Sequence, residues 1–230
     1  MFMGLVGSEM CIRDSYSSAW LLKDVQMEYL QEKFDKKGLM ILYTAPWPGQ
    51  GFYTKFPVNS VSDFSGKKLR IYSTATQQMG SMLGFNATIL PFAEIPQAFS
   101  TGLIEALFTS PQTGIDIQAW DNTKHFTYAG AIFSKNAVVV TKKAFNALSK
   151  GDQSNILAAA KKAELRGWEM SAETTKKQID ILKKNGMSSK NAPDEVISKM
   201  KSIGLEMMKN WRSKASPEAN SVLDRYLSMR

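Results

Sequence analysis

Three side chains suited to binding a small ligand fall at or near the ends of predicted strands between Gly66 and Ser110. Arg70 lies in the strand LRIYS, Phe92 follows the strand NATIL, and Ser110 ends the strand LIEALFTS. A guanidinium offers a planar fork of donors that matches a carboxylate, and it stays charged at neutral pH. Taken alone, an arginine at a strand end is more often a surface residue or a partner in a structural ion pair.

The elements between these strands are expected to bring the carboxyl ends of the strands to one edge of a sheet. A helix, TQQMGSMLG, follows the first strand, and a short helix with Pro96 in its first turn, AEIPQAFSTG, follows the second. Two β–α–β steps in so short a stretch predict a mostly parallel α/β sheet. Ligands of such sheets bind at the carboxyl ends of the strands, where Arg70, Phe92 and Ser110 fall.

Three motifs in this order resemble a known family. They read GKKLR (Gly66 to Arg70), LGFNATILPFAE (Leu83 to Glu94) and AFSTGLIEA (Ala98 to Ala106). Their order is similar to that of the solute-binding proteins of tripartite ATP-independent periplasmic (TRAP) transporters, the DctP family. The resemblance implies an α/β, two-lobed periplasmic binding protein (type II-like) with a long domain-spanning helix.

The resemblance also implies roles for individual residues. In the family, the arginine of the first motif grips the ligand carboxylate, and the position of Phe92 lines the ligand; plain core packing is the alternative for this ring. Asn136 matches a family hinge position, for which a simple turn residue is an equal alternative. Polar side chains that family members present to the ligand correspond here to Ser73, Thr109 and Ser110.

The segment PWPGQGF is expected to be an irregular crossing between the lobes, because two prolines and two glycines interrupt it. Gln50 and Tyr53, in or just after it, are candidate ligand contacts. A site rich in aromatic and amide groups would favour a weakly polar monocarboxylate, such as an aromatic or branched oxo acid. An exposed turn with aromatic anchors is the alternative interpretation.

The remaining elements are mostly helical. A helix is expected from Ser17 to the stop at Gly38, followed by the buried strand LMILYTAPW. HFTYAGAIF and NAVVVT are expected to be two strands. A helix from about Asp152 to Asn185 would span roughly 50 Å, enough to touch two lobes. Two further helices finish the chain. We expect residues 16–48 and 136–175 to be a remnant of lobe I, and residues 49–135 and 176–230 to form lobe II and the C-terminal helices.

Residues 6–15, VGSEMCIRDS, resemble a translated sequencing adapter. We therefore expect residues 1–15 to be a non-native segment without a signal peptide. The family resemblance begins at about Tyr16 and lacks the opening part of family members, so lobe I is expected to be incomplete. The one cysteine, Cys11, lies in the adapter-like segment, which leaves no thiol chemistry in the rest.

Composition and the absence of certain motifs argue against several classes of function. The formal net charge is +8, but acidic residues are interspersed among the lysines and no nucleic-acid motif is found, so we expect no nucleic-acid partner. No apolar run approaches the length of a membrane span, so direct membrane insertion is not expected. His125 is the only histidine, and no nucleophile elbow, phosphate loop or metal-ligand spacing occurs. No cofactor, metal or enzymatic activity is expected.

The resemblance thus implies an extracytoplasmic, periplasmic subunit. It would capture an organic acid through an arginine–carboxylate contact, close on it by a hinge motion and deliver it to the TRAP membrane permease. Two alternatives are a small-molecule enzyme acting on carboxylic acids and a basic interaction module.

Overall fold

The computed structural model describes residues 16–229, so the expectation for residues 1–15 lies outside the described residues. Within this range the chain divides into two compact units. Unit 1 comprises Pro48–Ile132 and Thr174–Lys214, and unit 2 comprises the residues up to Trp47, Phe133–Glu173 and those from Ala215 on. The chain therefore passes between the units several times, and each unit is built from distant segments of sequence.

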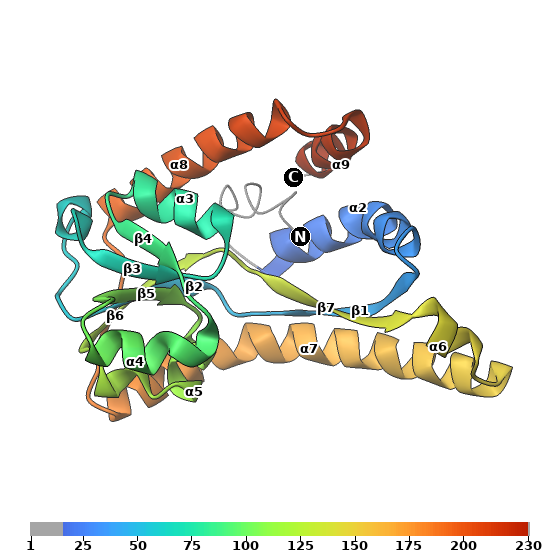
Figure 1. The fold of residues 1–230 in the computed structure, drawn as a ribbon, viewed down its shortest axis with the longest axis horizontal. Helices are drawn as coiled ribbons and strands as arrows, with labels where there is room; N and C mark the ends of the chain where they lie inside the picture. The colour runs from blue at the N-terminus through green and yellow to red at the C-terminus, as the bar shows by residue number, and fades with distance from the viewer. Residues whose placement is uncertain (1–15, 230) are drawn as a thin grey trace. The chain divides into compact units, whose positions relative to one another are not determined.

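Unit 1 is built on a six-stranded sheet in the order β4-β3-β5-β2-β6-β8 (Figure 1). β3 is parallel to β4 and β5, β6 is parallel to β8, and β2 alone runs against its neighbours. The predicted mostly parallel α/β sheet is therefore confirmed. The strands are β2 (Gln50–Thr54), β3 (Lys68–Ile71), β4 (Asn86–Ile89), β5 (Ala106–Thr109), β6 (His125–Ala131) and β8 (Ser188–Asn191).

The expectation of an irregular crossing through Phe52 is wrong, because β2 is a central strand that begins at Gln50. All five of its residues are buried, and it pairs with β5 on one side and β6 on the other. A Cβ at Gly51 would lie 2.5 Å from the Thr127 carbonyl oxygen, so the glycine permits the close approach of β6. The neighbouring prolines are typical of turns, and for that reason the sequence did not predict this strand.

Helices cover both faces of this sheet (Figure 1). On one face, α3 (Thr74–Met82) and α8 (Asp194–Arg212) bury apolar side chains in a cluster that includes Phe52 and Phe108. On the other face, α4 (Ile95–Ser100) and α5 (Pro111–Asp116) pack in a cluster that includes Tyr53 and Phe126. Because side chains alternate along a strand, Phe52 and Tyr53 serve opposite cores. Short 3-10 turns at Val61–Phe64 (η1), Phe92–Glu94 (η2) and Ala119–Asp121 (η3) complete the unit.

Unit 2 contains a two-stranded antiparallel sheet of β1 (Leu39–Pro46) and β7 (Lys135–Thr141). α2 (Tyr16–Asp35) packs against β1 and against α9 (Pro217–Ser228). α6 (Lys142–Asn146) follows β7. Trp20 and Trp168 meet edge to face, with ring centroids 4.9 Å apart. Residues 215–229 thus belong to the same unit as α2, whereas they were expected to group with the segment 49–135. That the two units correspond to the two lobes stays a prediction.

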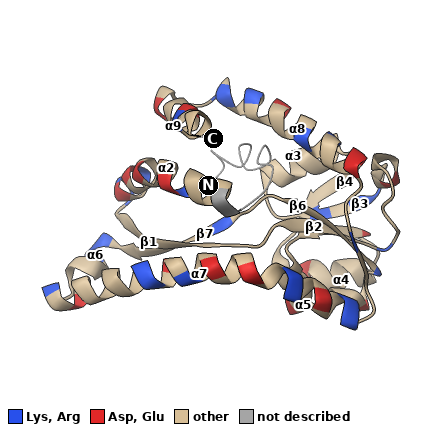
Figure 2. Cartoon of the chain, turned by 180° about the vertical axis from the view of Figure 1, so that it is seen from behind, with Lys and Arg blue, Asp and Glu red and all other residues tan. Residues whose placement is uncertain are grey.

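The predicted long helix is confirmed as α7 (Lys150–Lys184), which contributes residues to both units. Its 35 residues correspond to a length of about 50 Å. Acidic and basic residues both occur along α7 and α8 (Figure 2). No helix among residues 16–229 has both the length and the apolar character that a membrane crossing requires.

Candidate functional site

The carboxyl ends of the parallel strands of unit 1 bring most of the predicted residues to one edge of the sheet. Strands β3, β4 and β5 run in the same direction, so their last residues lie at this edge. β2 runs the other way, and its first residue, Gln50, comes to the same edge. We call this edge, with the residues that follow each strand, the carboxyl edge; its predicted members are Arg70, Ser73, Phe92, Thr109, Ser110 and Gln50.

Arg70 is the charged side chain of this group. It is only 5% exposed, and its Nε donates a hydrogen bond to the Leu90 carbonyl oxygen at 3.0 Å. It forms no ion pair with an aspartate or glutamate among residues 16–229. Burial lowers the pKa of the guanidinium from its ordinary value, and the nearby Tyr72 partly opposes that shift. Arg70 is therefore a largely buried cation without a described anionic partner.

Two serines at the carboxyl edge begin helices. Ser73 is the N-cap of α3 and accepts a hydrogen bond from the Thr76 amide at 3.2 Å. Ser110 is the N-cap of α5 and accepts from the Thr113 amide at 3.2 Å. Such caps satisfy amides that the first helical turn leaves without partners. The predicted polar positions therefore have a structural role already.

The other candidates differ in how much they can offer a ligand. Phe92 is 52% exposed at the start of η2, so it is not a core residue. Thr109 ends β5 and is buried. Asn136 lies on the exposed side of β7 in unit 2, opposite Ala45. Nothing in its pairing distinguishes Asn136 from an ordinary strand residue.

Tyr53 lies inside unit 1. Its ring is fully buried against Phe126, with centroids 4.4 Å apart, and its hydroxyl donates to the carbonyl oxygens of Ser110 and Pro111 at 3.3 and 3.4 Å. Burial raises the pKa of this phenol well above its ordinary value, with a smaller contribution from Asp116. Tyr53 thus anchors the start of α5 to the sheet.

Gln50 has protein partners at both ends of its amide. Its Nε2 donates to the Ile132 carbonyl oxygen at 3.1 Å, and its Oε1 accepts from the Tyr72 hydroxyl at 3.0 Å. Tyr72 was not among the predicted residues. Its position two residues after Arg70, directly after β3, was the available signal.

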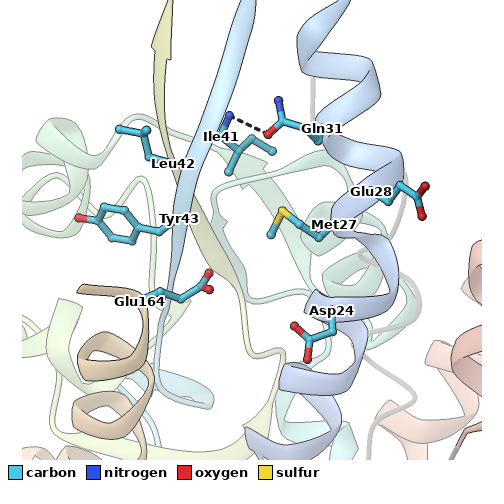
Figure 3. A pocket seen from close by; sticks show the side chains of 8 residues that line it. All are labelled: Asp24, Met27, Glu28, Gln31, Ile41, Leu42, Tyr43 and Glu164. Carbon is cyan, nitrogen blue, oxygen red and sulfur yellow. Dashed lines mark hydrogen bonds between the residues drawn. The ribbon is translucent and has the colours of Figure 1, made fainter. Parts of the chain in front are cut away.

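A pocket of about 510 Å³ lies in unit 2 between α2 and β1, and none of the predicted residues lines it (Figure 3). Glu164 at its wall accepts hydrogen bonds from the Thr44 amide and hydroxyl at 2.9 and 2.8 Å and from Lys23 at 3.3 Å. Gln31 accepts from the Ile41 amide at 3.1 Å. These side chains satisfy two amides of β1, a strand that pairs only with β7 in the described part of the chain.

The described residues bring no cluster of metal ligands together. No group of three or more His, Cys, Asp or Glu residues that could hold a metal occurs among residues 16–229. His125 begins β6, and within the same range its ring takes part in no hydrogen bond. The carboxyl edge thus contains a guanidinium, a group chemically suited to pairing with an anion, and the half-exposed ring of Phe92.

Comparison with known proteins gives consistent matches. Residues 10–214 match the sequence profile of the family described as bacterial extracellular solute-binding protein, family 7 (DctP). A solute-binding protein of Chromohalobacter salexigens is 25% identical over 160 residues, covering 66% of this chain and 47% of its own length. The chain thus spans about half the length of this curated relative.

Two solved structures are similar over nearly the whole chain. One is DctP7, an extracytoplasmic solute receptor of Bordetella pertussis that binds pyroglutamic acid; it is 36% identical, with a TM-score of 0.91, over 97% of this chain and 73% of its own. The other is a marine metagenome TRAP solute-binding protein specific for pyroglutamate and solved with the co-purified ligand. It is 30% identical, with a TM-score of 0.87, over 98% of this chain and 72% of its own.

Proposed function

Because the chain belongs to family 7 of the bacterial extracellular solute-binding proteins, the DctP family, we propose that it binds a small monocarboxylate of the pyroglutamate class for a TRAP transporter. Its place of action would be the periplasm, and its partner the TRAP membrane permease. It would release the ligand chemically unchanged. Two relatives at 36% and 30% identity bind pyroglutamate, which supports this choice of ligand.

The observation that carries the proposal is that Arg70 is buried while most of its N–H groups lack a described acceptor. A guanidinium has five N–H donors, and only the Nε–H of Arg70 has an acceptor among the described residues. Burial disfavours the charged form and lowers the arginine pKa, yet an arginine remains charged at neutral pH. A ligand carboxylate would supply both the missing charge and acceptors for the terminal nitrogens in a bidentate contact.

The other residues of the carboxyl edge fit a compact ligand that has one carboxylate and one small ring. Phe92, half exposed after β4, offers an aromatic face. Ser73 and Ser110 place the starts of α3 and α5 at the same edge, where amide dipoles favour a negative group. Pyroglutamate combines one carboxylate with a five-membered lactam. Its carboxylate would pair with Arg70, and its ring would lie against Phe92.

Titration calorimetry with L-pyroglutamate tests the proposal. Arg70→Met removes the charge but keeps an apolar stem, and we expect affinity to fall at least about tenfold because a charged hydrogen-bonded contact contributes about 1.5–3 kcal/mol. Arg166→Met makes the same change of charge at an exposed position of α7 and should leave affinity unaltered.

The uncharged carboxamide of pyroglutamate provides the matching change in the ligand. The chain should bind the amide more weakly than the acid, and Arg70→Met should lose this preference. If Arg70→Met binds the acid as tightly as the unmodified chain does, the arginine–carboxylate contact is refuted. If the unmodified chain binds neither compound, the proposed ligand is wrong.

A further inference from the structure

A chain of two hydrogen bonds, partly buried at Tyr72 and buried at Gln50, links the end of the strand that carries Arg70 to Ile132, after which the chain enters unit 2. Tyr72, directly after β3, donates its hydroxyl to Gln50 Oε1 at 3.0 Å. Gln50 Nε2 in turn donates to the Ile132 carbonyl oxygen at 3.1 Å. Ile132 is the final residue of the segment Pro48–Ile132, and Phe133 begins the next segment of unit 2.

Ile132 has an unusual backbone conformation at this point. Its φ is +56°, in the left-handed region that β-branched residues rarely adopt. The residue is 1% exposed and packs in the cluster that contains Phe52, so its side chain is held while its backbone is strained. Such strain persists only where the surrounding structure enforces it.

The Gln50 amide is a contact that can enforce this conformation. Gln50 is 2% exposed, and an irregularity in the pairing of β2 with β6 lies between Gln50 and Gly51. Since Gln50 opposes Ala131, its side chain reaches the carbonyl of the residue next to its pairing partner. Tyr72 fixes the other end of the amide, which determines which amide atom faces Ile132.

We propose that Tyr72 and Gln50 are positioning residues, which hold Ile132 in its left-handed conformation and thereby tie the carboxylate-binding strand β3 to the exit of the chain from unit 1. Gln50 then acts on the ligand through Ile132 and not by direct contact. The effect on ligand binding rests on the proposed function, whereas the effect on the conformation of Ile132 does not.

A rescue experiment separates positioning from direct contact. Gln50→Met keeps the length of the side chain but cannot donate to Ile132, so many molecules should leave the left-handed conformation. A left-handed non-glycine residue is disfavoured by a factor of roughly 5 to 150. We therefore expect Gln50→Met to weaken L-pyroglutamate binding about tenfold, and Tyr72→Phe to weaken it in the same direction by less.

Ile132→Gly should rescue these variants, because glycine adopts a positive φ without penalty. Gln50→Met combined with Ile132→Gly should bind within threefold of Ile132→Gly alone. Ile132→Ala is the matched control: it also removes the apolar side chain from the core, but its Cβ retains the penalty, so it should not rescue.

Equal weakening by Gln50→Met in the Ile132, Ile132→Gly and Ile132→Ala backgrounds would overturn the proposal and favour a direct ligand contact. No weakening in the Ile132 background would also overturn it. Should the unmodified chain not bind pyroglutamate, the proposed ligand fails. Urea unfolding of the same single and double variants then decides the positioning role. Rescue of stability by glycine and not by alanine supports that role, and equal losses refute it.

Discussion

Replacing Gly114 by alanine should destabilise unit 1, although alanine is the better helix former. Gly114 lies in α5, and a Cβ at this position would come 2.0 Å from the Tyr53 hydroxyl oxygen and 2.3 Å from Cζ of the same ring. The ring is fully buried and packs on Phe126, so it has no free space into which to move. The helix would therefore have to shift away from the sheet.

The expected loss follows from three contributions. Overpacking of a well-filled core costs about 1–3 kcal/mol. A shift of α5 also breaks the hydrogen bonds from Tyr53 to the carbonyls of Ser110 and Pro111, and a buried hydroxyl left without a partner costs about 1–3 kcal/mol. The gain in helix propensity is only about 1 kcal/mol. The free energy of unfolding should fall by roughly 3 kcal/mol.

Urea unfolding, followed by far-UV circular dichroism and tryptophan fluorescence, measures this loss. Gly167→Ala is the control, since a Cβ at this position of α7 has no heavy atom within 4 Å and should stabilise the helix by up to about 1 kcal/mol. In a Tyr53→Leu background, where the ring tip is gone, Gly114→Ala should cost little.

Two results would refute this reasoning. Unchanged or increased stability of Gly114→Ala would show that α5 does not lie so close to Tyr53. A loss of the same size in the Tyr53→Leu background would show that the ring is not the cause.

The remaining predictions concern one carboxylate in each unit. Asp63 accepts hydrogen bonds from the amides of Asn59 and Ser60 at 2.7 and 2.9 Å, which lower its pKa. Asp63→Asn should therefore destabilise the protein at pH 7. The difference in free energy of unfolding between the unmodified chain and the variant, measured with urea, should vanish as the pH falls from about 4 through the lowered folded-state pKa of Asp63. A difference that persists in acid contradicts this. Glu164→Ala leaves Thr44 and the buried Lys23 short of an acceptor and should cost about 1–3 kcal/mol in the same assay. Glu164→Gln keeps an acceptor for Thr44 and should cost less; equal losses would indicate that the charge alone matters.

The periodicity of apolar residues, together with glycines and prolines at helix ends, was enough to predict the long helices. α2, α7, α8 and α9 all occur where they were expected. Gly38 and Gly186, which were expected to end α2 and α7, both have positive φ values just beyond these helices, a conformation that glycine adopts at little cost. The strands β3, β4 and β5 were also predicted, because each lies between turn signals in a β–α–β order.

Two strands of the sheet could not be predicted from local sequence. β2 follows two prolines and contains a glycine, and its central place depends on pairing with β5 and β6, which lie more than fifty residues further along the chain. β8, with the sequence SSKN, has no apolar residue and is a strand because it pairs with β6. Long-range pairing overrides local preference at both places.

The candidate site divides in the same way. The sequence by itself determined the residue types and, through the motif order, the position of Arg70 at a strand end and the family of the chain. Only the tertiary structure decided which side chains remain available to a ligand: Tyr53 is used in the core, Gln50 is held by Tyr72 and Ile132, and Asn136 belongs to the other unit. The physical reason is that burial and hydrogen-bond partners depend on strands that meet from distant parts of the chain, whereas a motif records only neighbours in sequence.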